Sequence, residues 1–263
     1  MRKFGFLLLL LTSALCSFSQ DKTLFKKHWF IQNGDTMPYR VLLPKAYDST
    51  KLYPLIFFLH GRGESGRDNE KQLANGATLF LRDSIRERYP AIVVFPQCPA
   101  NNYWSNVIAE TSDSLNSRRT FYFVPNGEPT DAMRMLLSLT DHIVARYPIS
   151  KRKVYVGGLS MGGMGTYELV RRKPGFFAAA FAICGGAHPA TAKQLTKTNW
   201  WLFHGLKDDV VLPEFTRQME VALKKGGARV KASYYPNANH NSWDPAFAEP
   251  GLMQWLFANM WGK

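Results

Sequence analysis

The sequence predicts an α/β fold in which helices cover both faces of a mostly parallel sheet. Short, continuous apolar runs, typical of strands buried on both faces, alternate along the chain with segments of helical periodicity. Of the 263 residues, 46% are hydrophobic and 14% aromatic, which is enough for a large core and excludes a disordered chain. One domain of this length is ordinary, so we expect a single domain over residues 20–263.

Residues 1–19 have the order of a secretory signal peptide. Arg2 and Lys3 give a positive start, residues 6–11 form an apolar run, and small residues follow. We expect cleavage after Ser19 and an exported protein, either periplasmic or extracellular. A membrane anchor is the alternative, but the apolar run is shorter than the roughly 20 residues that span a bilayer. No stable membrane insertion is therefore expected after cleavage.

The cysteines leave two questions open. Cys16 raises the alternative of a lipoprotein, but Leu15 before it is too bulky for the usual lipidation motif. Cys98 and Cys184 both lie beside predicted strand ends, where they could form one bridge or remain buried thiols. No CxxC, HExxH or other clustered metal-ligand pattern is present, so the sequence points to no metal or cofactor.

The chain is basic. Its formal charge of +13 falls to +11 when Arg2 and Lys3 leave with the signal peptide, which carries no acidic residue. A basic protein can favour acidic partners such as polyuronates. The lysines and arginines are scattered, however, without a basic helix or stripe, so we expect a solvated cationic surface and no nucleic-acid partner.

The strands are predicted in chain order. Residues 24–43 predict an antiparallel hairpin that turns at Asn33-Gly34-Asp35. Residues 230–235 alternate in polarity, which suits the edge of a sheet. The buried strands are predicted from apolar runs at residues 55–59, 91–95, 154–156, 178–183 and 200–203.

Helical periodicity fills the intervals between these strands. Residues 131–146 predict a helix with Thr130 as its N-cap. Further helices are predicted over residues 70–87, 161–172, 213–225 and 246–260.

An insertion at residues 100–128 breaks the alternation of strands and helices. The stretch is long and polar but contains several aromatic residues, including Tyr103 and Trp104. Long ordered loops of this kind are often lids or binding loops, and the aromatic residues need somewhere to pack. We favour a binding loop; the alternative is a partly disordered surface insertion.

The segment from Gly158 to Gly162 has the sequence Gly-Leu-Ser-Met-Gly, which matches the nucleophile elbow G-x-S-x-G. In such an elbow a serine sits on a strained turn between a strand and a helix, and the glycines allow close approach of the neighbouring backbone. The motif alone is weak, but here it follows a predicted strand and opens a predicted helix. Ser160 is therefore the candidate nucleophile.

A serine nucleophile needs a base that is held by an acid. In elbows of this type both follow the serine in chain order. Asp208 and Asp209 follow the strand at 200–203 and compete for the acid; capping of the next helix is the alternative for both. His240 follows the last strand and is the candidate base, with His188 as the runner-up.

An oxyanion hole needs two N–H donors. The backbone N–H of Met161, directly after the nucleophile, is one candidate. The segment His60-Gly61-Arg62-Gly63 follows the first buried strand, and its glycines allow the backbone to approach a carbonyl oxygen, so Arg62 N–H is the second candidate. We expect His60 to brace this loop rather than to act as a base.

Taken together, these segments resemble the α/β-hydrolase superfamily, and within it secreted esterases of the feruloyl-esterase and polyhydroxybutyrate-depolymerase type; similar proteins are also labelled predicted peptidases. The resemblance covers roughly residues 37–260. In that family the acid is the fourth residue after the histidine of a His-Gly pair, which selects Asp208. The motifs that carry the resemblance are His60-Gly61-Arg62-Gly63-Glu64, Pro96-Gln97-Cys98-Pro99, Gly158-Leu159-Ser160-Met161-Gly162, His204-Gly205-x-x-Asp208 and His240-Asn241-x-Trp243.

The resemblance implies hydrolysis of carboxylic esters through an acyl-enzyme, without cofactor, on small-molecule or polysaccharide-linked esters such as feruloyl groups. Tyr103, Trp104 and Trp243 are candidates for stacking on a sugar or phenolic ring; ordinary core packing is the alternative for each. A serine peptidase is a second hypothesis. A non-catalytic carbohydrate-binding protein is a third, which the intact set of serine, acid and base disfavours.

Overall fold

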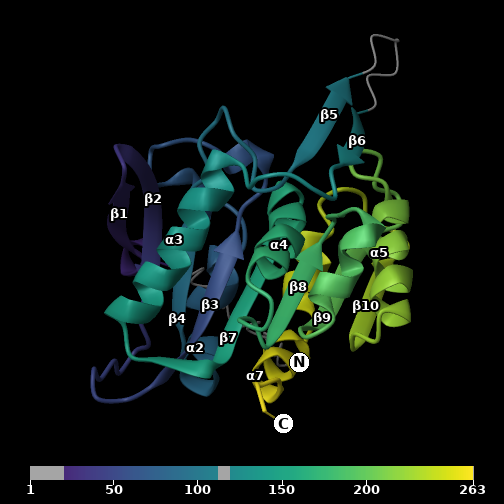
Figure 1. Cartoon of the computed structure of the whole chain (residues 1–263). Helices are drawn as coiled ribbons and strands as arrows, with labels where there is room; N and C mark the ends of the chain where they lie inside the picture. Colours follow the sequence, from purple (N-terminus) through teal and green to yellow (C-terminus); the bar gives the residue numbers. More distant parts are fainter. Residues whose placement is uncertain (1–20, 112–118, 263) are drawn as a thin grey trace, which may run out of the picture.

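The computed structural model describes residues 21–111 and 119–262, and a mixed sheet lies at its centre (Figure 1). The eight strands are ordered β1-β2-β4-β3-β7-β8-β9-β10. The strands from β4 to β10 in this order are mutually parallel. At the other edge β2 pairs antiparallel with β4, and β1 pairs antiparallel with β2. The bounds are β1 Lys26–Gln32, β2 Asp35–Leu42, β3 Tyr53–Leu59, β4 Ile92–Pro96, β7 Ile149–Leu159, β8 Ala179–Ile183, β9 Asn199–Gly205 and β10 Val230–Tyr235.

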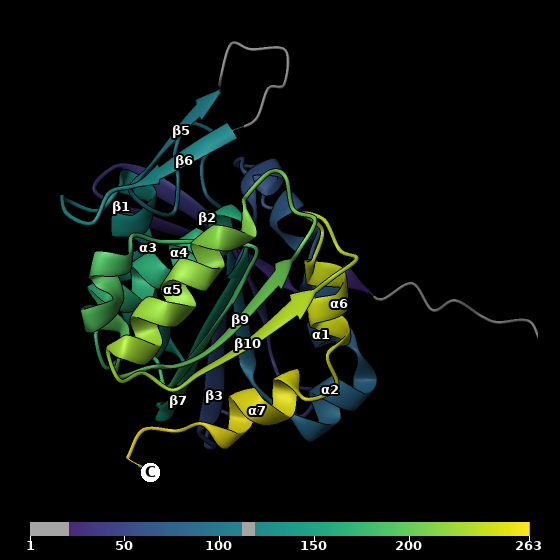
Figure 2. The same cartoon turned by 90° about the vertical axis from the view of Figure 1, so that its right-hand side faces the viewer.

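Helices cover both faces of this sheet (Figure 2). On one face lie α3 (Asp131–Arg146), α4 (Met161–Arg172) and α5 (Pro213–Lys225); on the other lie α1 (Ala77–Leu81), α2 (Asp83–Arg88), α6 (Trp243–Ala248) and α7 (Leu252–Ala258). A separate hydrophobic core lies on each face of the sheet. Successive side chains of β3 point to opposite faces, so Phe57 packs in one core and Ile56 and Phe58 pack in the other. The predicted mostly parallel sheet, with helices on both faces and an antiparallel N-terminal hairpin, is confirmed.

Several elements agree with the sequence in detail. Asn33 and Gly34 both have positive φ angles, 52° and 83°, as the two-residue turn of the first hairpin requires. Thr130 caps α3, since its Oγ1 accepts a hydrogen bond of 3.1 Å from Met133 N. The predicted bounds of α3, α4 and α5 are those of the structure. Strand β10 lies at the sheet edge, as its alternating pattern indicates.

Two segments that were each predicted as one continuous helix are divided in the structure. The segment at 70–87 forms a short turn of 3₁₀ helix (Lys71–Leu73), then α1 and α2. It breaks at Gly76 because the φ of 87° there is left-handed; a side chain at this position would also meet the ring of Phe58 at 2.7 Å. The segment at 246–260 is likewise divided, into α6 and α7, with residues 249–251 between them. Strand β7 is longer than the predicted run at 154–156. Its segment at 150–153 is polar, with Lys151 and Arg152 exposed, and so gave no apolar signal.

The insertion contains a β-hairpin that was not predicted. Strands β5 (Val107–Thr111) and β6 (Arg119–Phe123) pair antiparallel and rise above the sheet (Figure 1). Phe121 packs against Met164 of α4, and the rings of Phe123 and Phe215 lie 5.2 Å apart. The hairpin is therefore anchored on α4, the helix that follows Ser160, and on α5. The tip of the insertion and the predicted signal peptide at 1–19 lie outside the described residues.

Hydrogen bonds from two arginines of α4 hold the end of the insertion. Glu168 is buried and receives hydrogen bonds from Arg171 and Arg172. These arginines also donate to Pro125 O at 3.0 Å and Gly127 O at 2.6 Å. Within residues 21–111 and 119–262, no helix has the length and apolar character needed to cross a membrane.

Candidate active site

Ser160 lies on a strained turn between β7 and α4. Its φ of 53° and ψ of −120° place it in a region that non-glycine residues rarely adopt. Its backbone N–H donates to Ile183 O at the end of β8, at 2.9 Å. The strand before it and the helix after it thus present the hydroxyl at the carboxyl edge of the sheet.

The two glycines of the elbow permit this turn because they have no side chain. A Cβ atom on Gly162 would overlap Leu59 O at the end of β3. A Cβ on Gly158 would overlap the backbone of Gly162. Any larger residue at either position would push the strand end and the helix apart, so the spacing of the motif follows from backbone contact.

Ser160, His240 and Asp208 form a continuous chain of hydrogen bonds. The Oγ atom of Ser160 lies 3.0 Å from His240 Nε2, and His240 Nδ1 lies 2.8 Å from Asp208 Oδ2. Because Asp208 accepts at Nδ1, that nitrogen carries the proton, and Nε2 is free to accept from the serine. The arrangement has the geometry of a nucleophile, a general base and an orienting acid.

Asp208 is buried, and its carboxylate is surrounded by donors. Its Oδ1 accepts from the backbone N–H groups of Val210 at 2.9 Å and Val211 at 3.0 Å. Burial alone would raise the pKa of Asp208, but the hydrogen bonds from His204, His240 and Val211 outweigh it and hold the pKa well below its ordinary value. Asp208 is therefore an anion throughout the neutral range. Asp209 is exposed.

His204 is a residue whose contribution the sequence did not reveal. It is fully buried on β9, and its Nε2 lies 3.1 Å from Asp208 Oδ2 and 2.8 Å from Val211 O. Its Nδ1 lies 2.6 Å from Thr216 Oγ1 on α5. The histidine thus ties Asp208 to a helix and to its own loop, which makes it a positioning residue. Its occurrence four residues before the acid was the available signal.

Gly205 brings the loop of His240 onto the end of β9. A side chain on Gly205 would overlap Asn239 O and Ala238 O. The loop is further held by hydrogen bonds from Lys207 N to Ala238 O at 3.0 Å and from Leu206 N to Tyr235 O at 2.9 Å. In the His-Gly pair, His204 therefore positions the acid Asp208, and Gly205 allows the close approach of the loop that carries the base His240.

The candidate oxyanion donors lie at the starts of two helices. Met161 begins α4 and Arg62 begins a 3₁₀ turn, Arg62–Glu64, so neither N–H has an acceptor within its own helix. The guanidinium of Arg62 donates to Asn102 O at 2.9 Å and Ala100 O at 2.6 Å, and it lies over the Tyr103 ring at 4.5 Å. These contacts hold the loop that carries the Arg62 N–H.

His60 braces this loop, as expected. It is fully buried, its Nε2 accepts from Cys98 N at 2.9 Å, and its Nδ1 contacts Gly61 O at 2.6 Å. Burial lowers the pKa of His60 to about 4, so the ring is neutral near pH 7. The alternative base, His188, caps a 3₁₀ helix (Pro189–Leu195) by accepting from Ala190 N at 3.2 Å.

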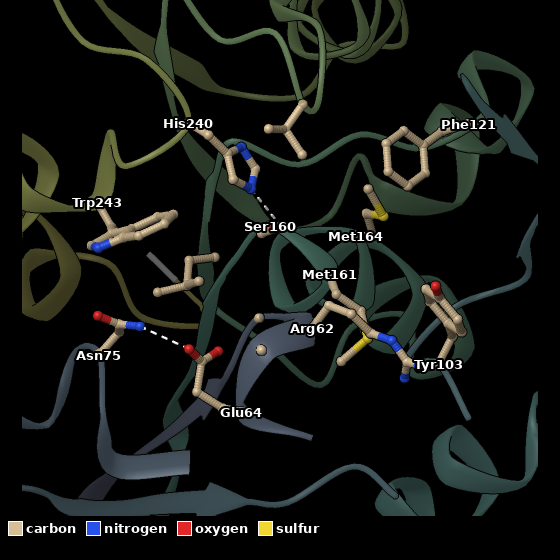
Figure 3. A pocket seen from close by; sticks show the side chains of 14 residues that line it. Arg62, Glu64, Asn75, Tyr103, Phe121, Ser160, Met161, Met164, His240 and Trp243 are labelled. Atoms are coloured by element: carbon tan, nitrogen blue, oxygen red, sulfur yellow. Dashed lines mark hydrogen bonds between the residues drawn. The ribbon is translucent and has the colours of Figure 1, made fainter. Parts of the chain in front are cut away.

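A cavity of about 280 Å³ opens at Ser160 (Figure 3). Tyr103 and Trp243 line it, as do Phe121 from the hairpin and Met164 from α4. The Trp243 ring lies 5.6 Å from His240 at nearly a right angle. Trp104 does not line the cavity: it is fully buried, and its Nε1 donates to His60 O at 3.3 Å. Of the two roles left open for Trp104, core packing is the one observed.

Cys98 and Cys184, the cysteines that lie among the described residues, are free and buried. Cys184 follows β8, and its sulfur lies with ligand atoms of Asp208 and His240, all within 4.8 Å of one another. This is the set of side chains, among the described residues, that could hold a metal ion. Burial raises the pKa of the Cys184 thiol well above its ordinary value, so the sulfur is protonated in the free protein.

Sequence comparison gives this geometry a family context. Residues 47–249 match the phospholipase/carboxylesterase family. The lysophospholipase-like protein 1 of Mus musculus is 28% identical over 215 residues, which are 78% of this chain and 85% of that protein. The poly(3-hydroxybutyrate) depolymerase of Ralstonia pickettii is 30% identical over 139 residues, which are 52% of this chain and 26% of that protein.

Solved structures agree with these matches. A thermostable esterase has a TM-score of 0.78 and 29% identity; the match covers 90% of this chain and 64% of the esterase, so this chain spans a little less than two thirds of that protein. A ferulic acid esterase from Anaeromyces mucronatus, solved with ferulic acid, has a TM-score of 0.63 and 14% identity, with 89% and 90% of the two chains covered. At that identity the likeness shows the fold alone.

Replacement of His204 by glutamine should lower kcat by roughly 10- to 100-fold with little change in KM. The reason is that an amide cannot span Asp208 and Thr216 as the ring does, and small displacements of a positioned group reduce rates to this extent. KM should hold because His204 does not line the cavity. Steady-state kinetics on a short p-nitrophenyl ester measures both.

His142→Gln is the matched control, because that histidine lies on α3 and makes no contact with the site. Urea denaturation of all three proteins separates loss of fold from loss of alignment. A folded His204→Gln variant with unchanged kcat would show that Asp208 needs no help from His204.

Proposed function

The chain belongs to the phospholipase/carboxylesterase family and is a serine hydrolase of carboxylic esters with the α/β-hydrolase fold, and we propose that it works through an acyl-enzyme formed on Ser160. The observation that carries this proposal is the hydrogen-bond chain from Ser160 through His240 to Asp208. The Ser160 end of this chain lies in the cavity. Arg62 and Met161, whose backbone N–H groups stand at helix starts, line the same cavity.

Acylation begins when Ser160 Oγ attacks the ester carbonyl carbon. His240 Nε2 accepts the serine proton, and the imidazolium that forms is stabilised by the anionic Asp208. The carbonyl oxygen becomes an oxyanion that accepts hydrogen bonds from the N–H groups of Arg62 and Met161. Collapse of this intermediate breaks the bond to the alcohol oxygen, which takes the proton from His240 and leaves as the alcohol.

Deacylation repeats these steps with water. His240 Nε2 accepts a proton from the water molecule as its oxygen attacks the acyl carbonyl, and the same N–H groups bind the second oxyanion. The bond to Ser160 Oγ then breaks, and His240 returns the proton to the serine. The products are a carboxylic acid and the regenerated enzyme.

The substrate we propose is a small-molecule or polysaccharide-linked ester, with feruloyl esters as one group to test. Aromatic side chains on both sides of the cavity, Tyr103 and Trp243, support a ring in the substrate because aromatic pairs favour stacked or edge-on contacts. The similarity to a poly(3-hydroxybutyrate) depolymerase also supports an ester substrate. We also propose that the protein is exported.

Ser160→Ala should reduce ester hydrolysis by about 10⁴-fold or more, because the nucleophile is lost while the cavity remains. Short p-nitrophenyl esters and methyl ferulate are the substrates, each compared with the amide of the same acyl group. Ser49→Ala, on an exposed loop, is the control.

Ester turnover that persists in Ser160→Ala would contradict the proposed nucleophile. Faster turnover of the amides than of the esters would favour a peptidase instead. If the wild-type protein hydrolyses neither series, the proposed reaction is wrong.

Export should leave a mature chain that begins at Gln20, because we expect cleavage after Ser19. Expression of the full chain in a Gram-negative host, followed by intact-mass measurement of the periplasmic and medium fractions, tests this. A full-length mass confined to the cytosolic fraction would contradict export. A lipid-modified mass that begins at Cys16 would point to the lipoprotein alternative.

A further inference from the structure

The cavity at Ser160 contains a polar pair that the proposed reaction does not use. Glu64 ends the 3₁₀ turn that begins at Arg62, and Asn75 precedes α1; both line the cavity. Asn75 Nδ2 donates to Glu64 Oε1 at 2.9 Å. Figure 3 shows the pair below Trp243, on the side of Ser160 away from Phe121 and Met164. The cavity thus has a polar end and an apolar end.

The Glu64 carboxyl is close to the reacting atoms. A Cβ atom built on Gly61 would lie 3.1 Å from Glu64 Oε2 and 3.6 Å from Ser160 Cβ. A single carbon atom at that position would therefore touch both the Glu64 carboxyl and the side chain of Ser160. A substrate group that reached this carboxyl would have to lie within a few bonds of the ester carbonyl.

The carboxyl has capacity to accept further hydrogen bonds. Its Oε2 is shielded from solvent and accepts no hydrogen bond of good geometry from the described residues, although the backbone N–H groups of Gly61 and Glu64 lie near the carboxyl. Burial raises the pKa of Glu64 above its ordinary value, although Asn75 and the backbone N–H groups of Glu64 and Gly61 oppose the shift. A shielded carboxyl oxygen without a donor is unfavourable, and a donor supplied by a ligand would relieve it.

We propose that Glu64 and Asn75 bind a hydroxyl group of the substrate, so that the enzyme prefers esters with a hydroxyl within a few bonds of the ester carbonyl. The inference rests on the proposed esterase function. The hydroxyl donates to the Glu64 carboxyl, and Asn75 holds that carboxyl in place. The hydroxyl could belong to the acid or to the alcohol part of the ester, and the chemistry of recognition is the same.

The surroundings of the pair favour a neutral hydroxyl over an ammonium group. Arg62, the basic residue that lines the cavity beside Glu64, would repel a cation, and the chain as a whole is basic. Trp243 offers an apolar face beside the pair, which suits the C–H groups next to a hydroxyl. A site built to bind a hydroxyl discriminates strongly against the analogue that lacks it, because its polar groups are then unpaired.

The test compares kcat/KM within two matched pairs of esters. Methyl 3-hydroxybutanoate against methyl butanoate places the hydroxyl in the acid; 2-hydroxyethyl butanoate against propyl butanoate places it in the alcohol. We expect the wild-type enzyme to prefer the hydroxylated member of one pair by roughly 10- to 100-fold, the range for a hydrogen bond to a charged group. The pair that shows the preference identifies which part carries the hydroxyl.

Glu64→Gln should lower this preference about 10-fold or more, and Asn75→Leu should lower it in the same pair. Glu87→Gln, an exposed position on α2, is the matched control and should leave the preference as it is in the wild type. Because the readout is a ratio of two substrates on one protein, a smaller amount of folded enzyme does not change it.

Three results would overturn the inference. The wild type could hydrolyse both members of each pair equally. Glu64→Gln could slow both members equally, which would assign Glu64 only to the support of the Arg62 loop. Methyl 3-aminobutanoate could be preferred over its hydroxyl counterpart. A wild-type enzyme inert toward all of these esters would instead contradict the proposed function itself, and the subsite with it.

Discussion

The backbone of Ser160 is the constraint on which the rest of the site depends. A non-glycine residue in its conformation costs about 1–3 kcal/mol and persists only when its surroundings hold it there. Here the end of β3, the end of β7 and the start of α4 meet so closely that Gly158 and Gly162 cannot carry side chains. The hydrogen bond from Ser160 N to Ile183 O adds a fourth segment. The strain is thus maintained by the sheet itself.

The parallel order of the strands then supplies the partners of the serine. Strands β7, β9 and β10 end at the same edge, so Ser160, Asp208 and His240 meet although up to 80 positions separate them. The buried Asp208 carboxylate is tolerable because four groups donate to it, from its own loop, from His204 and from His240. One buried anion therefore organises the two loops that must stay aligned with the nucleophile.

The sequence was most informative where local chemistry decides structure. The apolar runs predicted buried strands, Thr130 predicted a helix start, and the G-x-S-x-G motif predicted a turn between a strand and a helix. The structure contains each of these features. Interactions between distant segments were not visible. Gly76 breaks a periodic helix with a left-handed φ at a place where Phe58 of β3 leaves no room for a side chain, and the polar segment at 150–153 of β7 belongs to the sheet only through its neighbours. Trp104 looked like a binding residue, yet it packs beside Gly165 and His60.

The same limit applies within the site. The order of Ser160, Asp208 and His240 along the chain was sufficient to nominate them, and the resemblance to known esterases chose Asp208 over Asp209. The contributions of His204 and Glu64 depend on which atoms face them after folding. Neither residue type nor spacing carries that information: a histidine before a glycine and a glutamate in a glycine-rich loop are compatible with many surroundings.

The central claim, that Ser160 carries the acyl group, is tested most directly by mass spectrometry of the quenched enzyme. The protein is mixed with a p-nitrophenyl ester, stopped in acid within the first turnovers, and digested. We expect the peptide that contains Ser160 to gain the mass of the acyl group, and the gain to be absent from His240→Ala. An acyl group on any other residue, or the same adduct in His240→Ala at the wild-type rate, would contradict the account.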